Sequence, residues 1–217
     1  MNDDLSGTCK DFDIETIHVD AHILVVNKPS GLLSVPGRGP EKWDCVVHRV
    51  QNRYPTAKIV HRLDCATSGL MVLALDADSH RELSRQFHDR EVAKCYEAEI
   101  FGALEVEEGE VNLPLMPDWP NRPRQMVHED GKSALTRYYC LTRSEGRSRV
   151  KLEPITGRSH QLRVHMLSLG HPILGDNLYA HEQALVASPR LLLHATYLCL
   201  HHPETNEKLE FNCYAPF

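Results

Sequence analysis

HRLDCATSGLMVLALD, residues 61–76, carries the strongest fold signal in the chain. Its second half is a nearly continuous apolar run, which is typical of a buried strand in the centre of a sheet. The Thr-Ser-Gly before that run is typical of a tight turn. Asp64 stands just ahead of this turn, where a carboxylate could close the turn, bind a metal ion or take part in a reaction. These residues alone leave all three roles open.

The flanking sequence predicts more strands than helices, and several strands follow one another with no helix between them. We expect strands or strand pairs over 22–31, 58–64, 69–76, 94–102, 134–156, 191–203 and 207–216, and helices over 43–55, 76–91 and 157–170. The last helix should have about three turns, and the four prolines within 113–125 indicate an extended loop. Arg62 and Asp64 should share one face of the strand over 58–64, because alternate residues of a strand point the same way. The pattern predicts an α+β fold with a mixed, largely antiparallel sheet and flanking helices and loops.

Composition favours one globular domain. The chain has 217 residues, 41% of them hydrophobic, and no apolar run approaches the ~20 residues of a membrane helix. The N-terminus has no signal or transit pattern, so we expect a cytoplasmic protein with no membrane partner. We expect residues 1–20, which hold six acids and one lysine, to form a flexible tail, and residues 21–217 to form a single domain. Seven cysteines without a C-x-x-C pair indicate reduced thiols, and no zinc or other metal site is expected.

The charges are unevenly distributed along the chain, although the net charge is −6. Residues 122–163 contain ten basic and four acidic residues, whereas residues 97–118 contain seven acids and no base. A basic face is typical of a nucleic-acid binder. Basic residues on exposed strands can equally well be solvated without any function, and charge alone does not separate the two interpretations.

Four stretches could carry chemistry, and each has a plain structural interpretation as a turn, a strand or a helix surface. They are VNKPSGLLSVPG (26–37), HRLDCATSGL (61–70), KCYEAEIFG (94–102) and ITGRSHQLRVHM (155–166). A serine-hydrolase elbow and a glycine-rich phosphate loop are both absent from the sequence. Glu97 or Glu99 could be the second carboxylate of a glycosidase, but neither has an obvious partner.

Taken together, the four stretches resemble the RluA family of pseudouridine synthases. The matches are N-K-P-x-G-L, H-R-L-D-x-x-T-S-G-L, K-x-Y-x-A and T-G-R-x-H-Q-L-R-x-H, in the family's order and spacing, and they extend from about His22 to the C-terminus. The resemblance implies the pseudouridine synthase catalytic fold and an enzyme that moves the ribose link of a uridine in RNA from N1 to C5. It also implies that no cofactor and no metal are used. The chain is similar to the short members of the family, which lack an added S4-type RNA-binding domain.

The resemblance assigns the catalytic roles to three residues. Asp64 would act as nucleophile or stabilise charge, Tyr96 would stack on the uracil or act as a base, and Arg163 would pair with Asp64 and keep it ionised. Arg62 would enter the space that a flipped uridine leaves, and Leu162 would pack beside the base. The other candidates for substrate binding are His61, Arg158, His160, Gln161, Lys28, Arg38, Arg122, Arg124 and Lys132.

The expected substrates are RNA stem-loops. The short family members act on one uridine of 23S ribosomal RNA and one in the anticodon stem-loop of certain tRNAs, so both are expected here by resemblance, with a monomeric enzyme. Two alternatives remain: an RNA-binding module without catalysis, and a hydrolase that cleaves a glycosidic bond.

Overall fold

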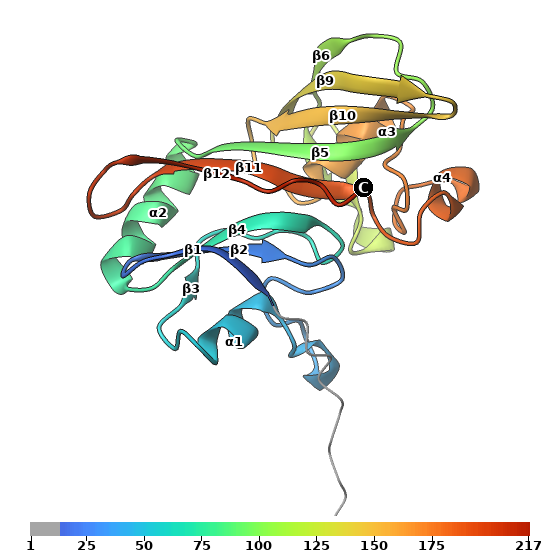
Figure 1. Cartoon of the computed structure of the whole chain (residues 1–217). Coiled ribbons are helices and arrows are strands. Elements are labelled where there is room, and N and C mark those ends of the chain that lie inside the picture. Colours follow the sequence, from blue (N-terminus) through green and yellow to red (C-terminus); the bar gives the residue numbers. More distant parts are fainter. Residues whose placement is uncertain (1–13) are drawn as a thin grey trace, which may run out of the picture.

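A single mixed sheet of ten strands forms the centre of the molecule (Figure 1); the computed structural model describes residues 14–217. The strands are β1 Glu15–Val19, β2 Ile23–Lys28, β3 Lys58–Ile59, β4 Ser68–Ala74, β5 Ala93–Phe101, β6 Glu108–Asn112, β9 Leu135–Ser144, β10 Arg147–Pro154, β11 Leu193–His201 and β12 Lys208–Asn212. The helices are α1 Val46–Gln51, α2 Ala77–Asp89, α3 Gln161–Ser168 and α4 Glu182–Val186. The strand order is β1-β2-β4-β11-β5-β10-β9-β6, with β12 on β11 and β3 on β4. Every pairing except β4–β11 is antiparallel, which confirms the predicted α+β class.

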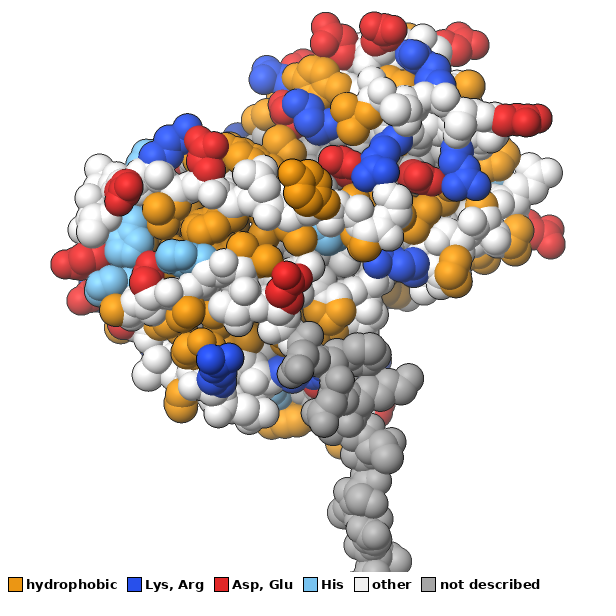
Figure 2. All heavy atoms as spheres, in the orientation of Figure 1, with side chains coloured by type: hydrophobic (Ala, Val, Ile, Leu, Met, Phe, Trp, Pro, Cys, Tyr) orange, Lys and Arg blue, Asp and Glu red, His pale blue; other side chains and the backbone are white. Residues whose placement is uncertain are grey.

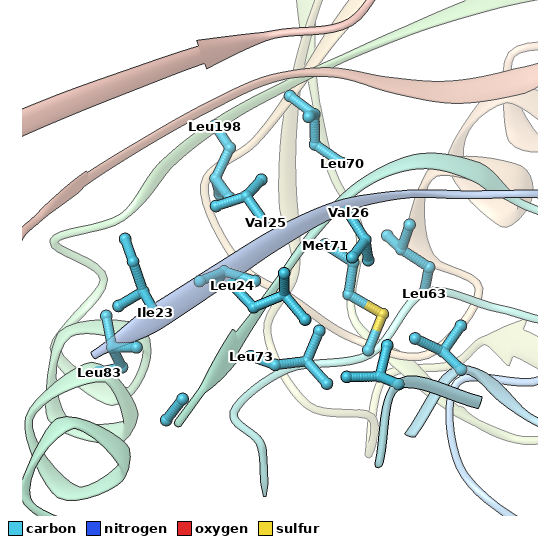
Figure 3. Packing of buried hydrophobic residues seen from close by; sticks show 14 of the residues in the cluster. Ile23, Leu24, Val25, Val26, Leu63, Leu70, Met71, Leu73, Leu83 and Leu198 are labelled. Carbon is cyan, nitrogen blue, oxygen red and sulfur yellow. The ribbon is translucent and has the colours of Figure 1, made fainter. Parts of the chain in front are cut away.

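Two large hydrophobic cores and two smaller clusters pack on the described part of the chain. The first contains residues of β2, β4, α1 and α2, and Figure 3 shows Leu63, from the loop before β4, among them. The second lies between β5, β9, β10 and α3. Tyr96 of β5 packs against both cores, so its position is set by the two halves of the molecule together.

Gly69 makes the parallel β4–β11 contact possible. It lies opposite Ala195 in register, and a Cβ at this position would come within 2.4 Å of the Ala195 carbonyl oxygen. Its φ of +112° also lies in the region that favours glycine. The Thr-Ser-Gly sequence therefore serves the approach of two strands as well as the turn.

The strand predicted over 58–64 is shorter than expected. Only Lys58–Ile59 pair with β4, and residues 60–67 form an irregular loop. The prediction that Arg62 and Asp64 share a strand face is therefore wrong. The physical reason is that backbone carbonyls of the loop accept hydrogen bonds from the side chains of Lys28, Ser30 and Ser34 instead of continuing the strand pairing with β4.

Two further elements differ from expectation. The proline-rich segment contains a short hairpin, β7 Leu115–Pro117 and β8 Gln125–Val127, joined through a 3-10 turn at Trp119–Asn121. Helix α3 has eight residues because His160, with a φ of 54°, is in a left-handed conformation that a helix cannot continue through.

The expected flexible tail over 1–20 is wrong in its last part. Residues 15–19 form β1, which pairs with β2, and the Asp20 carboxylate accepts the N–H groups of His22 and Ile23. Residues 1–13 lie outside the described residues. Between residues 14 and 217, no helix combines the length and the apolar character needed to cross a membrane.

The acidic and basic segments lie on neighbouring strands and neutralise each other. Ion pairs cross the strands of β5, β6, β9 and β10, and Figure 2 shows blue and red side chains intermixed over this half of the molecule. The pairs are Glu97–Arg149, Glu99–Arg147 and Glu110–Arg137, and Arg143 lies near Glu107. The expected basic face is therefore not formed by these residues, since each faces a carboxylate.

Candidate active site

One large cleft of about 2210 Å³ collects most of the predicted site residues. Ten of them line it: Lys28, His61, Arg62, Asp64, Tyr96, Arg158, His160, Gln161, Leu162 and Arg163. Four others, Arg38, Arg122, Arg124 and Lys132, are not among the lining residues. Instead, the Arg122 guanidinium stacks 3.5 Å from the Trp119 ring centroid and that of Arg124 lies 5.3 Å from the Tyr179 ring centroid.

The loop that carries Asp64 is held by the segment that follows β2. Ser30 Oγ donates to the Ala66 carbonyl, and Ser34 Oγ donates to the Leu63 carbonyl while accepting the Leu63 N–H. Leu63 itself is 6% exposed and anchors the loop in the first core. The N-K-P-S-G-L-L-S stretch is thus the scaffold of the Asp64 loop, although the sequence alone indicated only a turn.

Lys28 is part of this scaffold. Its Nζ is fully buried and donates to the carbonyls of Pro29, Leu32 and Cys65 at 2.9, 2.6 and 3.0 Å. Because an ammonium group has three donors, all are used within the protein. Burial lowers the pKa of Lys28 to about 8. The geometry therefore does not support the predicted contact between Lys28 and substrate.

The Asp64 carboxylate opens onto the cleft, with 29% of the side chain exposed. Its Oδ2 lies 3.6 Å from Arg163 Nη1 and 3.9 Å from His160 Nε2. The Asp64 carbonyl accepts the Thr67 N–H, which closes the tight turn expected at this point. One residue therefore both forms the turn and presents a carboxylate to the cleft.

Arg163 is held mainly by Asp176, a residue that sequence reasoning missed. Arg163 Nε and Nη2 donate to the two Asp176 carboxylate oxygens at 2.8 and 2.6 Å, and the side chains are 3% and 0% exposed. Burial acts to lower the pKa of Arg163, but Asp176 outweighs it and raises that pKa. The expected pairing of Arg163 with Asp64 is present as an ion pair at 3.6 Å. It is longer than the contact with Asp176, which holds the guanidinium on its other side. The GHPILGD stretch holds Asp176, but nothing in its local pattern indicates a partner 13 residues away.

Tyr96 stays a neutral phenol in the free protein. Burial first, and the charge of Asp64 second, raise the pKa of its hydroxyl well above the ordinary value. Its ring, packed against both cores, forms part of the cleft wall. A neutral aromatic wall next to a carboxylate is suited to contact with a planar base.

Three other predicted substrate contacts are used mainly within the protein. His61 Nε2 accepts the Val72 N–H and the ring stacks on Phe87 with centroids 4.5 Å apart; burial lowers the pKa of His61 to about 3. The Gln161 amide bonds to Leu135, Thr136, Thr156 and Arg158. Leu162 belongs to the second core.

The cleft has an excess of positive charge although the chain as a whole is acidic. Eight Lys and Arg residues line it against four Asp and Glu residues. Across residues 14–217, no carboxylate lies within ion-pair distance of four of these arginines: Arg62, Arg90, Arg158 and Arg190. Arg90 and Arg190 were missed, because nothing in their neighbourhood in the sequence marks them as cleft residues. Unpaired guanidinium groups are available to bind phosphate.

Within the described part of the chain, no group of three or more His, Cys, Asp or Glu residues is arranged to hold a metal ion. The cleft presents the Asp64 carboxylate, the Tyr96 phenol and several guanidinium groups.

Comparison with known proteins agrees with this geometry. The family model described as RNA pseudouridylate synthase matches residues 22–168. Two relatives named dual-specificity RNA pseudouridine synthase RluA, from Yersinia pestis and Escherichia coli K12, are 58% and 54% identical to this chain; each alignment covers 93% of this chain, and 98% and 93% of the relatives. The structure of human RNA Pseudouridylate Synthase Domain Containing 1 superposes with a TM-score of 0.81 at 28% identity, over 94% of this chain and 84% of that one. The chain therefore belongs to the RNA pseudouridylate synthase family, among relatives named RluA, and is an enzyme that forms pseudouridine in RNA.

Proposed function

We propose that Asp64 is the catalytic carboxylate of this pseudouridine synthase. The observation that carries the proposal is its place in a positively lined cleft, partly exposed between Arg163 and His160. In the reaction, the N1–C1′ bond of a uridine breaks, a C5–C1′ bond forms, and the proton of C5 leaves while N1 gains one. Uridine and pseudouridine contain the same atoms, so the reaction balances without a cofactor. Asp64 acts as a nucleophile or stabilises the positive charge as the first bond breaks.

Arg163 and Tyr96 have supporting roles beside Asp64: Arg163 stabilises its charge, and Tyr96 contacts the base. The pair with Asp176 fixes the Arg163 guanidinium, so its remaining nitrogen faces Asp64 and favours the ionised carboxylate. Because Tyr96 is neutral at rest, we assign its ring to contact with the uracil and its hydroxyl to hydrogen bonding or proton transfer during the rearrangement.

Arg62 is the candidate for the space that the target base leaves. A uridine in a stem-loop is stacked and must be extruded to reach Asp64, at a cost of about a few kcal/mol. The Arg62 side chain is exposed, lines the cleft and stands two residues before Asp64 in an irregular loop. Arg62 and Asp64 therefore border the same cleft, with the Arg62 side chain open to solvent.

The substrates that we propose are stem-loops of both 23S ribosomal RNA and tRNA, including the tRNA anticodon stem-loop. Support comes from the dual specificity in the names of the RluA relatives and from the four shared stretches. We also propose that the enzyme acts on RNA as a monomer, in the cytoplasm.

The test is Asp64→Asn, with Asp78→Asn as control because Asp78 is 85% exposed on α2. Asp64→Asn should fold, bind RNA and make no pseudouridine, whereas Asp78→Asn should keep full activity. Pseudouridine formed by Asp64→Asn would overturn the assignment. Release of free uracil would instead indicate a glycosidic hydrolase, and mapping pseudouridine in ribosomal and transfer RNA with and without the enzyme tests the substrates.

A further inference from the structure

Tyr179 is a buried residue at the edge of the active site to which neither the sequence stretches nor the proposed mechanism gives a role. It is 6% exposed, and its hydroxyl accepts the Gln125 N–H at 2.7 Å. The same hydroxyl oxygen lies 2.6 Å from His160 Nδ1. It therefore joins the β7–β8 hairpin to the residue that precedes α3.

The buried hydroxyl hydrogen of Tyr179 needs an acceptor, and we assign the direction of the second hydrogen bond on this basis. A phenol has one hydrogen to donate and lone pairs to accept with. The Gln125 N–H is a donor, so it uses a lone pair of Tyr179. Among the described residues, the remaining hydrogen-bond partner of Tyr179 is His160 Nδ1, and the hydroxyl hydrogen points there. Nδ1 is then an acceptor, and the neutral imidazole carries its hydrogen on Nε2.

That Nε2 faces the catalytic carboxylate. It lies 3.9 Å from Asp64 Oδ2, and burial lowers the pKa of His160, so the neutral ring is favoured. The ring position is restricted because His160 has a left-handed backbone at the start of α3. With Nε2 protonated, the N–H dipole points at the Asp64 charge; with Nδ1 protonated, a lone pair would oppose it.

We propose that Tyr179 is a positioning residue, which holds His160 as the Nε2–H tautomer and so keeps an N–H directed at Asp64. The proposal rests on the proposed catalytic role of Asp64. Tyr179 does not touch the reacting atoms; it acts through His160. Its ring also lies 5.1 Å from the Arg163 guanidinium carbon, so it borders both groups that flank the carboxylate.

The first test reads the tautomer without any assay of activity. Nitrogen-15 NMR of the histidine ring in the unsubstituted protein should show His160 protonated on Nε2 and bare on Nδ1. In Tyr179→Phe this preference should weaken or reverse. A His160 ring protonated on Nδ1 in the unsubstituted protein would overturn the proposal, whether or not Asp64 proves to be catalytic.

The second test asks whether Tyr179 acts through His160. We expect Tyr179→Phe to lower kcat about tenfold, the order expected from one lost hydrogen bond, with KM changed by less than about twofold. In a protein that already carries His160→Ala, the Tyr179→Phe substitution should lower kcat almost no further. If the full loss persists there, Tyr179 acts through Gln125 and the hairpin instead, and the proposal is wrong.

The matched control is Tyr139→Phe, which removes a hydroxyl 3.5 Å from Glu153 on the sheet. It should leave kcat, KM and the His160 spectrum unchanged. A shift of the His160 signals in this control would show that the spectrum reports general loosening, and would count against the assigned cause.

Discussion

Arginine residues occur in two regions of this molecule, and they are paired with carboxylates in one region and not in the other. On the sheet, Arg147 and Arg149 of β10 donate to Glu99 and Glu97 at 2.9 and 2.6 Å. In the cleft, Arg62, Arg90 and Arg158 have no carboxylate at ion-pair distance within residues 14–217. Arg147, Arg149 and the cleft residue Arg158 all come from the most basic segment of the sequence, residues 122–163, whereas Arg62 and Arg90 lie outside it.

From this difference we expect the availability of a charge to matter more for RNA binding than the density of charge along the chain. A paired guanidinium must first leave its carboxylate before it can bind a phosphate, whereas an unpaired one only exchanges water and counterions. A protein of net charge −6 can therefore present a cationic cleft. Arg163 is a third case, in which burial with Asp176 makes the pair a structural unit.

The largest expected effect comes from breaking that buried pair. Asp176→Asn removes the counter-charge of a guanidinium that is 3% exposed. We expect a loss of about 3 kcal/mol in the free energy of unfolding, because a buried charge is left without compensation. Urea unfolding measures it. Glu97→Gln, which removes the partner of Arg149 on the sheet, should cost about 1 kcal/mol or less, and equal losses would contradict the distinction between the regions.

The next effect is a pH dependence from the cleft wall. His194 is 1% exposed, and burial first, then the charge of Arg190, lower its pKa to about 4 from 6.5. Below pH 6.5 the unfolded chain takes up a proton that the folded chain refuses. Stability should thus be complete above about pH 6.5 and fall by about 1 kcal/mol per pH unit down to about pH 4. Unfolding free energies at several pH values test this.

The control for this pH effect is a comparison of two substitutions. His194→Asn should reduce the slope of stability between pH 6.5 and pH 4 by about 1 kcal/mol per pH unit and leave the contribution of His61, whose pKa is lowered as well. His88→Asn, at a side chain that is 87% exposed, should leave the slope unchanged. A slope in His194→Asn equal to that of the unsubstituted protein would contradict the role given to His194.

The comparison of arginines is tested directly by RNA binding. Arg62→Ala and Arg90→Ala should each weaken binding of a stem-loop about fivefold to tenfold and reduce the slope of log K against log salt by about 1. Arg147→Ala and Arg149→Ala should change affinity by less than about twofold, since their charges are already paired. A loss in the sheet variants as large as in the cleft variants would remove the basis of the comparison.

The smallest effect concerns the sheet pair Arg147–Glu99, whose side chains are 47% and 16% exposed. A double-mutant cycle with alanine should give a coupling of about 0.5 kcal/mol, decreasing in high salt. A coupling above about 2 kcal/mol would mean that these pairs are structural, like Arg163–Asp176.

Much of the fold could be predicted from local pattern. The apolar run within 69–76, the strand expected over 94–102 and the helix expected over 76–91 rest on local signals, and the structure confirms them as β4, β5 and α2. Prediction was less successful for residues 58–64, which were expected to form one strand. Only Lys58 and Ile59 are in a strand and the rest is a loop, and the residue types alone do not distinguish these two cases. The hairpin of the proline-rich segment was missed because its pairing depends on only three residues in each strand.

The candidate site also has a part that could be predicted from local sequence and a part that could not. The sequence alone determined that Asp64 stands in a tight turn before a buried strand, and the four stretches identified Tyr96 and Arg163 as its companions. Only the tertiary structure decided which charges are free, that Asp176 holds Arg163, and that Tyr179 meets His160. The physical reason is that turns and strands arise from neighbours along the chain, whereas an ion pair or a tautomer depends on which distant side chain folding brings within about 3 Å.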